Sequence, residues 1–92
     1  MTMLNSVKMA LRISHDELND EIVDLIEAAR ADLALSGVDA DKTKDDTDPL
    51  IKRAVITYCK AHFGLENEDS EKYQRSYDMI KKHLSLSGDY GV

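Results

Sequence analysis

The most apolar periodic stretch of the chain runs from residue 48 to residue 64 and predicts a helix from Asp48 to Phe63. Asp48 is a favourable N-cap, and Pro49 suits the first helical position, where a missing backbone N–H is harmless. Gly64 follows the last apolar residue, where a left-handed cap favours glycine. The predicted buried stripe consists of Ile51, Val55, Tyr58 and His62, widened by Leu50, Ala54 and Ala61. We expect the other helices to pack on this one.

A short helix is predicted at the start of the chain, from Met3 to about Arg12, with Thr2 or Asn5 as its cap. A longer helix should follow, from about Asp16 to Ser36. Its apolar stripe is Leu18, Ile22, Leu25 or Ile26, Ala29 and Leu33.

Capping signals set the expected limits of this second helix. Ser14 is followed three residues later by Glu17, which fits a capping box. Gly37 is the expected stop. At about 20 residues the helix would be about 30 Å long.

A last amphipathic helix is predicted from Asp69 or Ser70 to about Leu86, after a short link over 65–68, with Gly88 in its C-cap region. Its apolar stripe is Tyr73, Tyr77, Ile80 and Leu84. Two segments lack such periodicity. The polar stretch 38–47, anchored only by Val38, predicts an exposed, mobile loop, and 89–92 predicts a tail.

Taken together, these patterns predict an all-α fold, a compact bundle of about four helices in a single domain over residues 1–92. No sustained alternation or hairpin dipeptide indicates a strand.

The chain is acidic, with a formal net charge of −6 and an isoelectric point of about 4.9. Nucleic-acid binding relies mainly on Lys and Arg neutralising phosphates, so this balance argues against a domain that holds DNA. The single cysteine excludes an internal disulfide, and we find no signal peptide and no apolar run long enough to span a bilayer. A cytosolic protein, or one assembled in the cytosol, is therefore expected.

Candidate catalytic and metal-binding patterns are weak. A calcium loop starting at Asp39 would need Gly and Glu where Lys44 and Leu50 stand, so a solvated acidic loop is the better interpretation. Cys59 and His62 share one side of a helix, but no third group or oxyanion site accompanies them, which favours a buried structural cysteine. No metal-ligand spacing is present, so we expect no cofactor, no metal and no catalysis.

Charge separates onto different predicted helices. Asp20, Asp24 and Glu27 form an acidic stripe on the second helix, with Arg30 and Asp32 beyond it. The last two helices carry the basic residues Lys52, Arg53, Lys60, Lys72, Arg75, Lys81 and Lys82. The stripe is either a solvated face or a contact for a neighbouring subunit. Opposite charges on different faces suit a head-to-tail contact, which closes into a ring when the rotation allows.

Five blocks in order carry a resemblance. They are residues 7–13 (VKxxLRI), which an acidic turn follows, 24–33 (DLIEAARADL), 48–64 (DPLIKRAVITYCKAHFG), 73–78 (YQRSYD) and 84–90 (LSLSGDY). In this order and spacing the chain resembles the small head-tail connector proteins of long-tailed bacteriophages, also called head-completion or DNA-packaging adaptor proteins.

The resemblance implies a helical protomer without catalytic residues that joins a ring beneath the portal and extends the DNA channel. Its partners would be the portal protein, a tail or stopper protein and further copies of itself, at the head-tail junction of a virion assembled in the host cytoplasm. An acidic chain suits a channel through which DNA must slide without being bound. As candidate docking residues we take Asp39, Asp41 and Asp45 in the 38–47 loop and Asp89 and Tyr90 in the tail.

Three other functions remain open from the residues alone. The first is a small cytosolic adaptor or regulatory module that binds a partner helix. A helix-turn-helix DNA binder is less favoured, because the last helix mixes its basic residues with Glu71 and Asp78. An enzyme is favoured least, because no set of catalytic groups converges.

Overall fold

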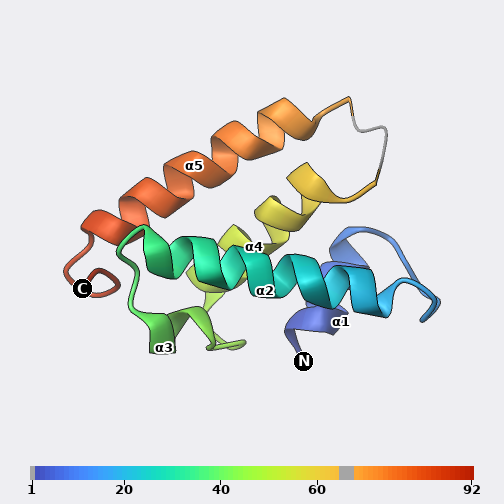
Figure 1. The fold of residues 1–92 in the computed structure, drawn as a ribbon, viewed down its shortest axis with the longest axis horizontal. Coiled ribbons are helices and arrows are strands. Elements are labelled where there is room, and N and C mark those ends of the chain that lie inside the picture. Colours follow the sequence, from blue (N-terminus) through green and yellow to red (C-terminus); the bar gives the residue numbers. More distant parts are fainter. Residues whose placement is uncertain (1, 65–67) are drawn as a thin grey trace.

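The computed structural model describes residues 2–64 and 68–92, and these residues form an all-helical bundle (Figure 1). The helices are α1 (Met3–Ala10), α2 (Asn19–Leu35), α3 (Ala40–Thr43), α4 (Pro49–His62) and α5 (Ser70–Leu86). The predicted all-α bundle is confirmed, with α3 as an additional short helix. The link predicted over 65–68 lies outside the described residues except for Glu68.

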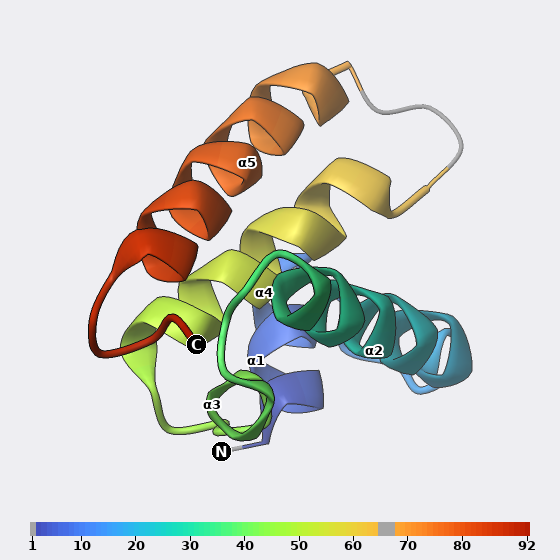
Figure 2. The same ribbon diagram turned by 60° about the vertical axis from the view of Figure 1, so that its left-hand side comes forward.

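The central position of α4 is confirmed, since it packs against α1, α2 and α5 (Figure 2). Its caps are those expected. The Asp48 carboxylate accepts hydrogen bonds from the backbone N–H groups of Leu50 at 2.9 Å and Ile51 at 3.2 Å. Gly64, just after the helix, has φ of +87°, a left-handed conformation that favours glycine. Local sequence therefore sets both ends of α4.

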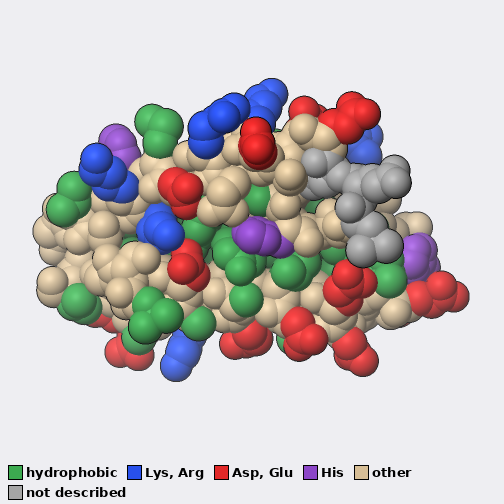
Figure 3. Space-filling model, turned by 45° about the horizontal axis from the view of Figure 1, so that its top comes forward, with side chains coloured by type: hydrophobic (Ala, Val, Ile, Leu, Met, Phe, Trp, Pro, Cys, Tyr) green, Lys and Arg blue, Asp and Glu red, His purple; other side chains and the backbone are tan. Residues whose placement is uncertain are grey.

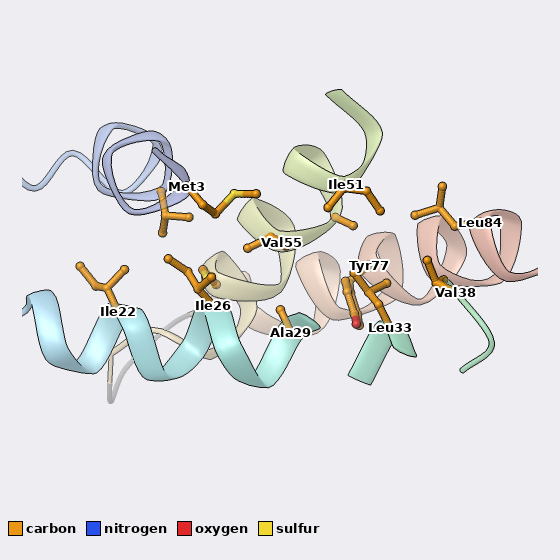
Figure 4. Close-up of a cluster of buried hydrophobic side chains, with 13 residues drawn as sticks. Met3, Ile22, Ile26, Ala29, Leu33, Val38, Ile51, Val55, Tyr77 and Leu84 are labelled. Carbon is orange, nitrogen blue, oxygen red and sulfur yellow. The ribbon is translucent and has the colours of Figure 1, made fainter. Parts of the chain in front are cut away.

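The core lies between α4 and the helices around it (Figure 4). Most predicted stripe residues are there, and the fully or nearly fully buried ones are Ile22, Ile26, Ala29, Leu33, Ile51, Ala54, Val55, Tyr77 and Leu84. Two members of the α4 stripe were predicted wrongly. Leu50 is 46% exposed in the first turn, and His62 is exposed in the last turn, where its ring bonds to Gln74. Cys59, one turn after Val55, completes the buried face instead.

The start of the second helix was also predicted wrongly. The helix begins at Asn19, and its N-cap residue, Leu18, has no side-chain cap. The Ser14 capping box does not form. In the segment between the two helices, the Asp16 carboxylate instead pairs with Lys8 Nζ of α1 at 2.7 Å. The predicted stop is confirmed, since Gly37 has φ of +104°.

The first helix is close to prediction. Thr2 is its cap, with Oγ1 accepting from the Asn5 N–H at 3.2 Å. The helix ends at Ala10, two residues before Arg12.

The segment 38–47 is more ordered and less exposed than predicted. Val38 and Thr43 are 1% and 2% exposed. Thr43 can be buried because its hydroxyl donates to the carbonyl of Ala40 at 2.7 Å, so no polar group is left unpaired. Asp39 caps the short helix α3 by accepting from the Asp41 N–H at 2.8 Å.

The C-terminal segment is not a free tail. After α5, with Ser87 as C-cap and Gly88 beyond it, the chain folds back onto the residues that follow α2. The Asp39 N–H donates to the Tyr90 carbonyl at 2.7 Å, and the Val92 N–H donates to the Gly37 carbonyl at 2.9 Å. An isolated antiparallel bridge joins Val38 and Gly91. The two segments predicted to be mobile therefore hold each other.

Candidate assembly surfaces

The acidic stripe predicted on α2 is present on the surface. Asp20, Asp24 and Glu27 are all exposed, and Val23, which is 39% exposed, lies among them on the same face. Glu27 Oε1 is 3.5 Å from Arg30 Nη1, a weak surface pair one turn along the helix. The stripe is thus three carboxylates around one exposed aliphatic side chain.

The basic candidates on α4 line a groove between α4 and α5. Lys52, Arg53 and Lys60 belong to its wall, and Ile56 and Ile80 are half-buried side chains within it. The groove has a volume of about 410 Å³. We call it the α4–α5 groove; its remaining lining residues are Pro49, Thr57, Tyr73 and Ser76.

Aromatic and apolar groups extend this surface. Lys60 Nζ lies 5.4 Å from the centre of the Tyr73 ring, in the range of a cation–π contact. Arg53 and Ile80 also line an adjoining apolar hollow near Met79, which is 64% exposed. A partner with both carboxylates and aliphatic side chains would suit such a surface.

The acidic stripe on α2 and the α4–α5 groove lie on separate surfaces of the molecule. Figure 3 shows mostly acidic side chains along the lower edge, and Lys and Arg side chains mixed with acidic ones along the upper edge. The stripe on α2 points away from α4, because Ile22 and Ile26 on the opposite face of α2 are buried in the core. One copy therefore does not bring its own acidic stripe to its own α4–α5 groove.

The predicted docking residues near α3 and the C-terminus have mixed roles. Asp39 and Tyr90 come together, but through internal bonds: Asp39 caps α3, and the Tyr90 hydroxyl donates to Asp48 Oδ2 at 3.0 Å. Asp45 accepts from the Thr47 hydroxyl at 2.6 Å, and this bond, with the one from the Thr47 N–H, lowers the pKa of the Asp45 carboxyl. Asp41 and Asp89 are exposed.

A polar cluster between α2 and α5 was not predicted from the sequence. The hydroxyl of Tyr77, a fully buried residue, donates to Asp32 Oδ2 at 2.6 Å, and Lys81 Nζ is 3.1 Å from the same oxygen. Burial first, then the bond to Asp32, raises the pKa of Tyr77 well above its usual value. Burial opposes ionisation of Asp32, but the Tyr77 hydrogen bond and Lys81 outweigh it and lower the pKa of Asp32. The spacing of these residues in the sequence holds no signal of the cluster.

A second unpredicted cluster joins the start of the chain to the segment before α4. Arg30 Nη2 pairs with Asp46 Oδ1 at 2.5 Å, and Asp46 Oδ2 accepts from the Met3 N–H at 3.2 Å. Arg30 was placed on the outer face of α2 by its spacing, but its side chain is only 18% exposed. Arg30 and Asp46 act as structural clamps.

The described residues weighed as catalytic or metal-binding candidates show no reactive group and no metal site. Cys59 is fully buried, as predicted, and burial raises the pKa of its thiol to about 12, which leaves it protonated and unreactive. Among residues 2–64 and 68–92, no group of three or more His, Cys, Asp or Glu side chains is placed to hold a metal ion. Within the same residues, no helix is both long and apolar enough to cross a bilayer.

Comparison with known proteins supplies the remaining finding. The model of a family described as "Phage connector protein" matches residues 3–91, nearly the whole chain. No curated protein and no solved structure matches significantly. The family match covers all five helices and the C-terminal segment that folds back on the chain.

Proposed function

The chain belongs to the phage connector protein family, and from this premise we propose that it forms a ring beneath the portal of a tailed phage, joining head to tail and extending the DNA channel. The observation that carries this proposal is the match over residues 3–91. The family is a structural one, associated with phage head and tail proteins, so the role is mechanical and not catalytic. The protein acts as one helical domain over residues 1–92 in the virion, after assembly in the host cytoplasm.

The charge distribution supports a ring built from repeated weak contacts. Acidic residues on α2 and basic residues on α4 lie on different surfaces, so each copy offers two unlike faces to its neighbours. Individual surface ion pairs are weak, but many contacts around a ring templated by the portal add up to a stable assembly. The net charge of −6 lets DNA pass through the ring without being held.

The corner formed by α3 and the C-terminal segment is our proposed contact for the portal, or for a tail or stopper protein. Its exposed carboxylates are Asp41, Asp45 and Asp89, while Asp39 and Tyr90 hold the corner in shape. The corner contains no long helix and is held by a few hydrogen bonds of Asp39 and Tyr90. It can therefore change shape when a partner docks without the unwinding of a long helix.

The test is mass photometry with negative-stain microscopy across a concentration series, alone and with the purified portal of the same phage. We expect closed rings with a central hole wide enough for duplex DNA, formed by the protein alone or on the portal. Monomers at every concentration, together with no binding to the portal, would contradict the proposal. A portal from an unrelated phage is the control for template specificity.

A further inference from the structure

The α4–α5 groove has positively charged side chains along its wall and an apolar surface within it. An occupant that fits this groove needs carboxylates and an aliphatic side chain. Arg53 and Lys60 are seven positions apart on α4, so they are separated by about 10.5 Å along the helix axis. Ile56 lies between them on α4, and together with Ile80 of α5 it forms the half-buried apolar part of the groove. The groove therefore offers cations near two positions about two turns apart, with an apolar surface between them.

The acidic stripe on α2 has the complementary spacing. Asp20 and Glu27 are also seven positions apart, again about 10.5 Å along a helix axis. Val23 and Asp24 lie between them on the same face, at the i+3 and i+4 positions. The stripe thus presents two carboxylates two turns apart with an exposed aliphatic side chain between them.

We propose that the α2 stripe of one copy seats in the α4–α5 groove of the next copy. Val23 rests on Ile56 and Ile80, and Asp20 and Glu27 face the cations on α4. A second copy is the occupant because its stripe matches the groove in charge sign, in spacing and in the position of the apolar group. This inference rests on the proposed function, since it names the contact by which the copies associate.

The contact is head-to-tail, because the stripe and the groove are on different faces of one copy. Each copy uses its stripe on one neighbour and its groove on the other, so the contact repeats from copy to copy and closes where the rotation permits. Such a contact is heterologous, in contrast to an isologous dimer, in which both partners use the same patch.

A charge exchange tests the pairing. In one variant Asp20 and Asp24 become Lys (D20K/D24K), and in the other Lys52 and Arg53 become Glu (K52E/R53E). Each variant alone opposes like charges, so we expect neither to self-associate. In an equimolar mixture the stripe of each variant can meet the oppositely charged groove of the other variant, and we expect association to return to the level of the original protein.

The readout is sedimentation velocity at low ionic strength, where surface charges are least screened, after circular dichroism has shown that both variants are folded. Mixing that restores nothing overturns the pairing.

Cross-linking tests the contact even if free copies associate weakly. One copy carries Val23→Cys and another carries Thr57→Cys, which lines the groove. The two are mixed at high concentration and oxidised. The matched control pairs Val23→Cys with Leu35→Cys, a site 89% exposed, so random collisions would favour the control. The buried Cys59 stays in place.

We expect the Val23–Thr57 pair to cross-link several-fold more than the control pair. Cross-linking at or below the control level overturns the inference and leaves the groove to DNA or to a head or tail protein. If rings still form on the portal in that case, the proposed function stands and only this contact is wrong. If the cross-link forms but no closed ring appears in either setting, the contact stands and the ring is wrong.

Discussion

The hydroxyl of Tyr77 lies 2.6 Å from Asp32 Oδ2, across 45 positions of sequence, and ties the middle of α5 to the end of α2. Around it Lys81 reaches the same carboxylate, and the Tyr58 ring meets the Tyr77 ring edge-on at a centroid distance of 5.1 Å. A buried aromatic ring with its polar end bonded contributes both apolar burial and a defined orientation. This pair therefore fixes how α5 sits against the rest of the bundle.

Two substitutions at Tyr77 separate these contributions. Tyr77→Phe keeps the buried ring and loses one hydrogen bond, so we expect a loss of about 1–2 kcal/mol in the free energy of unfolding. Tyr77→Ala also empties the site of the ring, so the loss should be about 3–5 kcal/mol. Urea unfolding followed by circular dichroism measures both. Equal losses in the two variants would show that the bond to Asp32, and not ring packing, dominates.

The contribution of Asp32 to the free energy of unfolding should decrease in acid. Because the folded pKa of Asp32 is lowered below its usual 3.8, its contribution is present above the unfolded pKa and is lost as pH falls through the folded pKa. Asp32→Asn removes this titration, so the variant should lose less stability than the original protein between pH 6 and pH 3, a window that spans this usual value. Asp16 and Asp45, whose pKa values are also lowered, remain in both proteins and cancel in the comparison. Equal pH dependence in urea unfolding would remove Asp32 from this role.

The close packing of Gly91 against the end of α5 should be needed to hold the C-terminal segment on the bundle. A Cβ there would lie 2.5 Å from the Ser85 carbonyl oxygen and 2.9 Å from that of Ser87, so Gly91→Ala should detach the segment. A Cβ at Gly88 meets nothing within 4 Å, which makes Gly88→Ala the matched control. We expect faster hydrogen exchange at the Asp39 and Val92 amides in the first variant only. Similar exchange in both would mean that the segment is held elsewhere.

The acidic stripe predicts a defect in assembly without a defect in folding. Changing Asp20, Asp24 and Glu27 together to Lys leaves the core untouched, since all three are exposed, and should impair ring formation or portal docking. The control changes Glu17, Glu68 and Glu71 to Lys, which alters the net charge equally at exposed positions outside the stripe, the groove and the corner formed by α3 and the C-terminal segment. Negative-stain counting of rings compares the two. Full assembly of the stripe variant would exclude these residues from the contact.

The charge balance predicts that the protein does not retain DNA. In a gel-shift experiment at physiological salt we expect no shift of duplex DNA, because phosphate binding requires clustered cations and the chain has a net charge of −6. A basic helix-turn-helix protein run alongside serves as the positive control. Salt-dependent retention of the duplex would favour the DNA-binding alternative.

The parts of this fold that local chemistry determines could be predicted from the sequence. Asp48 and Pro49 start α4, Gly64 follows its end, and the apolar stripes of α2 and α5 are buried much as their spacing indicates. These features depend on residues within one or two turns of each other, where capping and periodicity act.

The errors and omissions arise where a distant residue competes with a local rule. Lys8 of α1 pairs with Asp16 just before α2, and α2 starts at Asn19, later than the Ser14 signal indicates. Thr43 is an exception of a different kind: it is polar and still buried because its hydroxyl bonds locally to the Ala40 carbonyl, three residues earlier. The bonds of Asp32 to Tyr77 and Arg30 to Asp46 depend on how helices pack, which single-helix periodicity does not contain. The acidic stripe and the basic groove were placed on the right helices, but their pairing across copies is still a prediction.

The segment between α2 and α4 fastens both ends of the described chain. Asp46 accepts from the Met3 N–H across 43 positions, and Asp48 accepts from the Tyr90 hydroxyl across 42 positions. Contacts of such long range close large loops, so they form after the local turns of α2, α4 and α5 during folding. We therefore expect the helices to form first in folding, and the bonds that attach the two ends of the chain to form last. Substitutions that break these bonds among residues 37–48 should therefore mainly speed unfolding and leave the folding rate nearly unchanged.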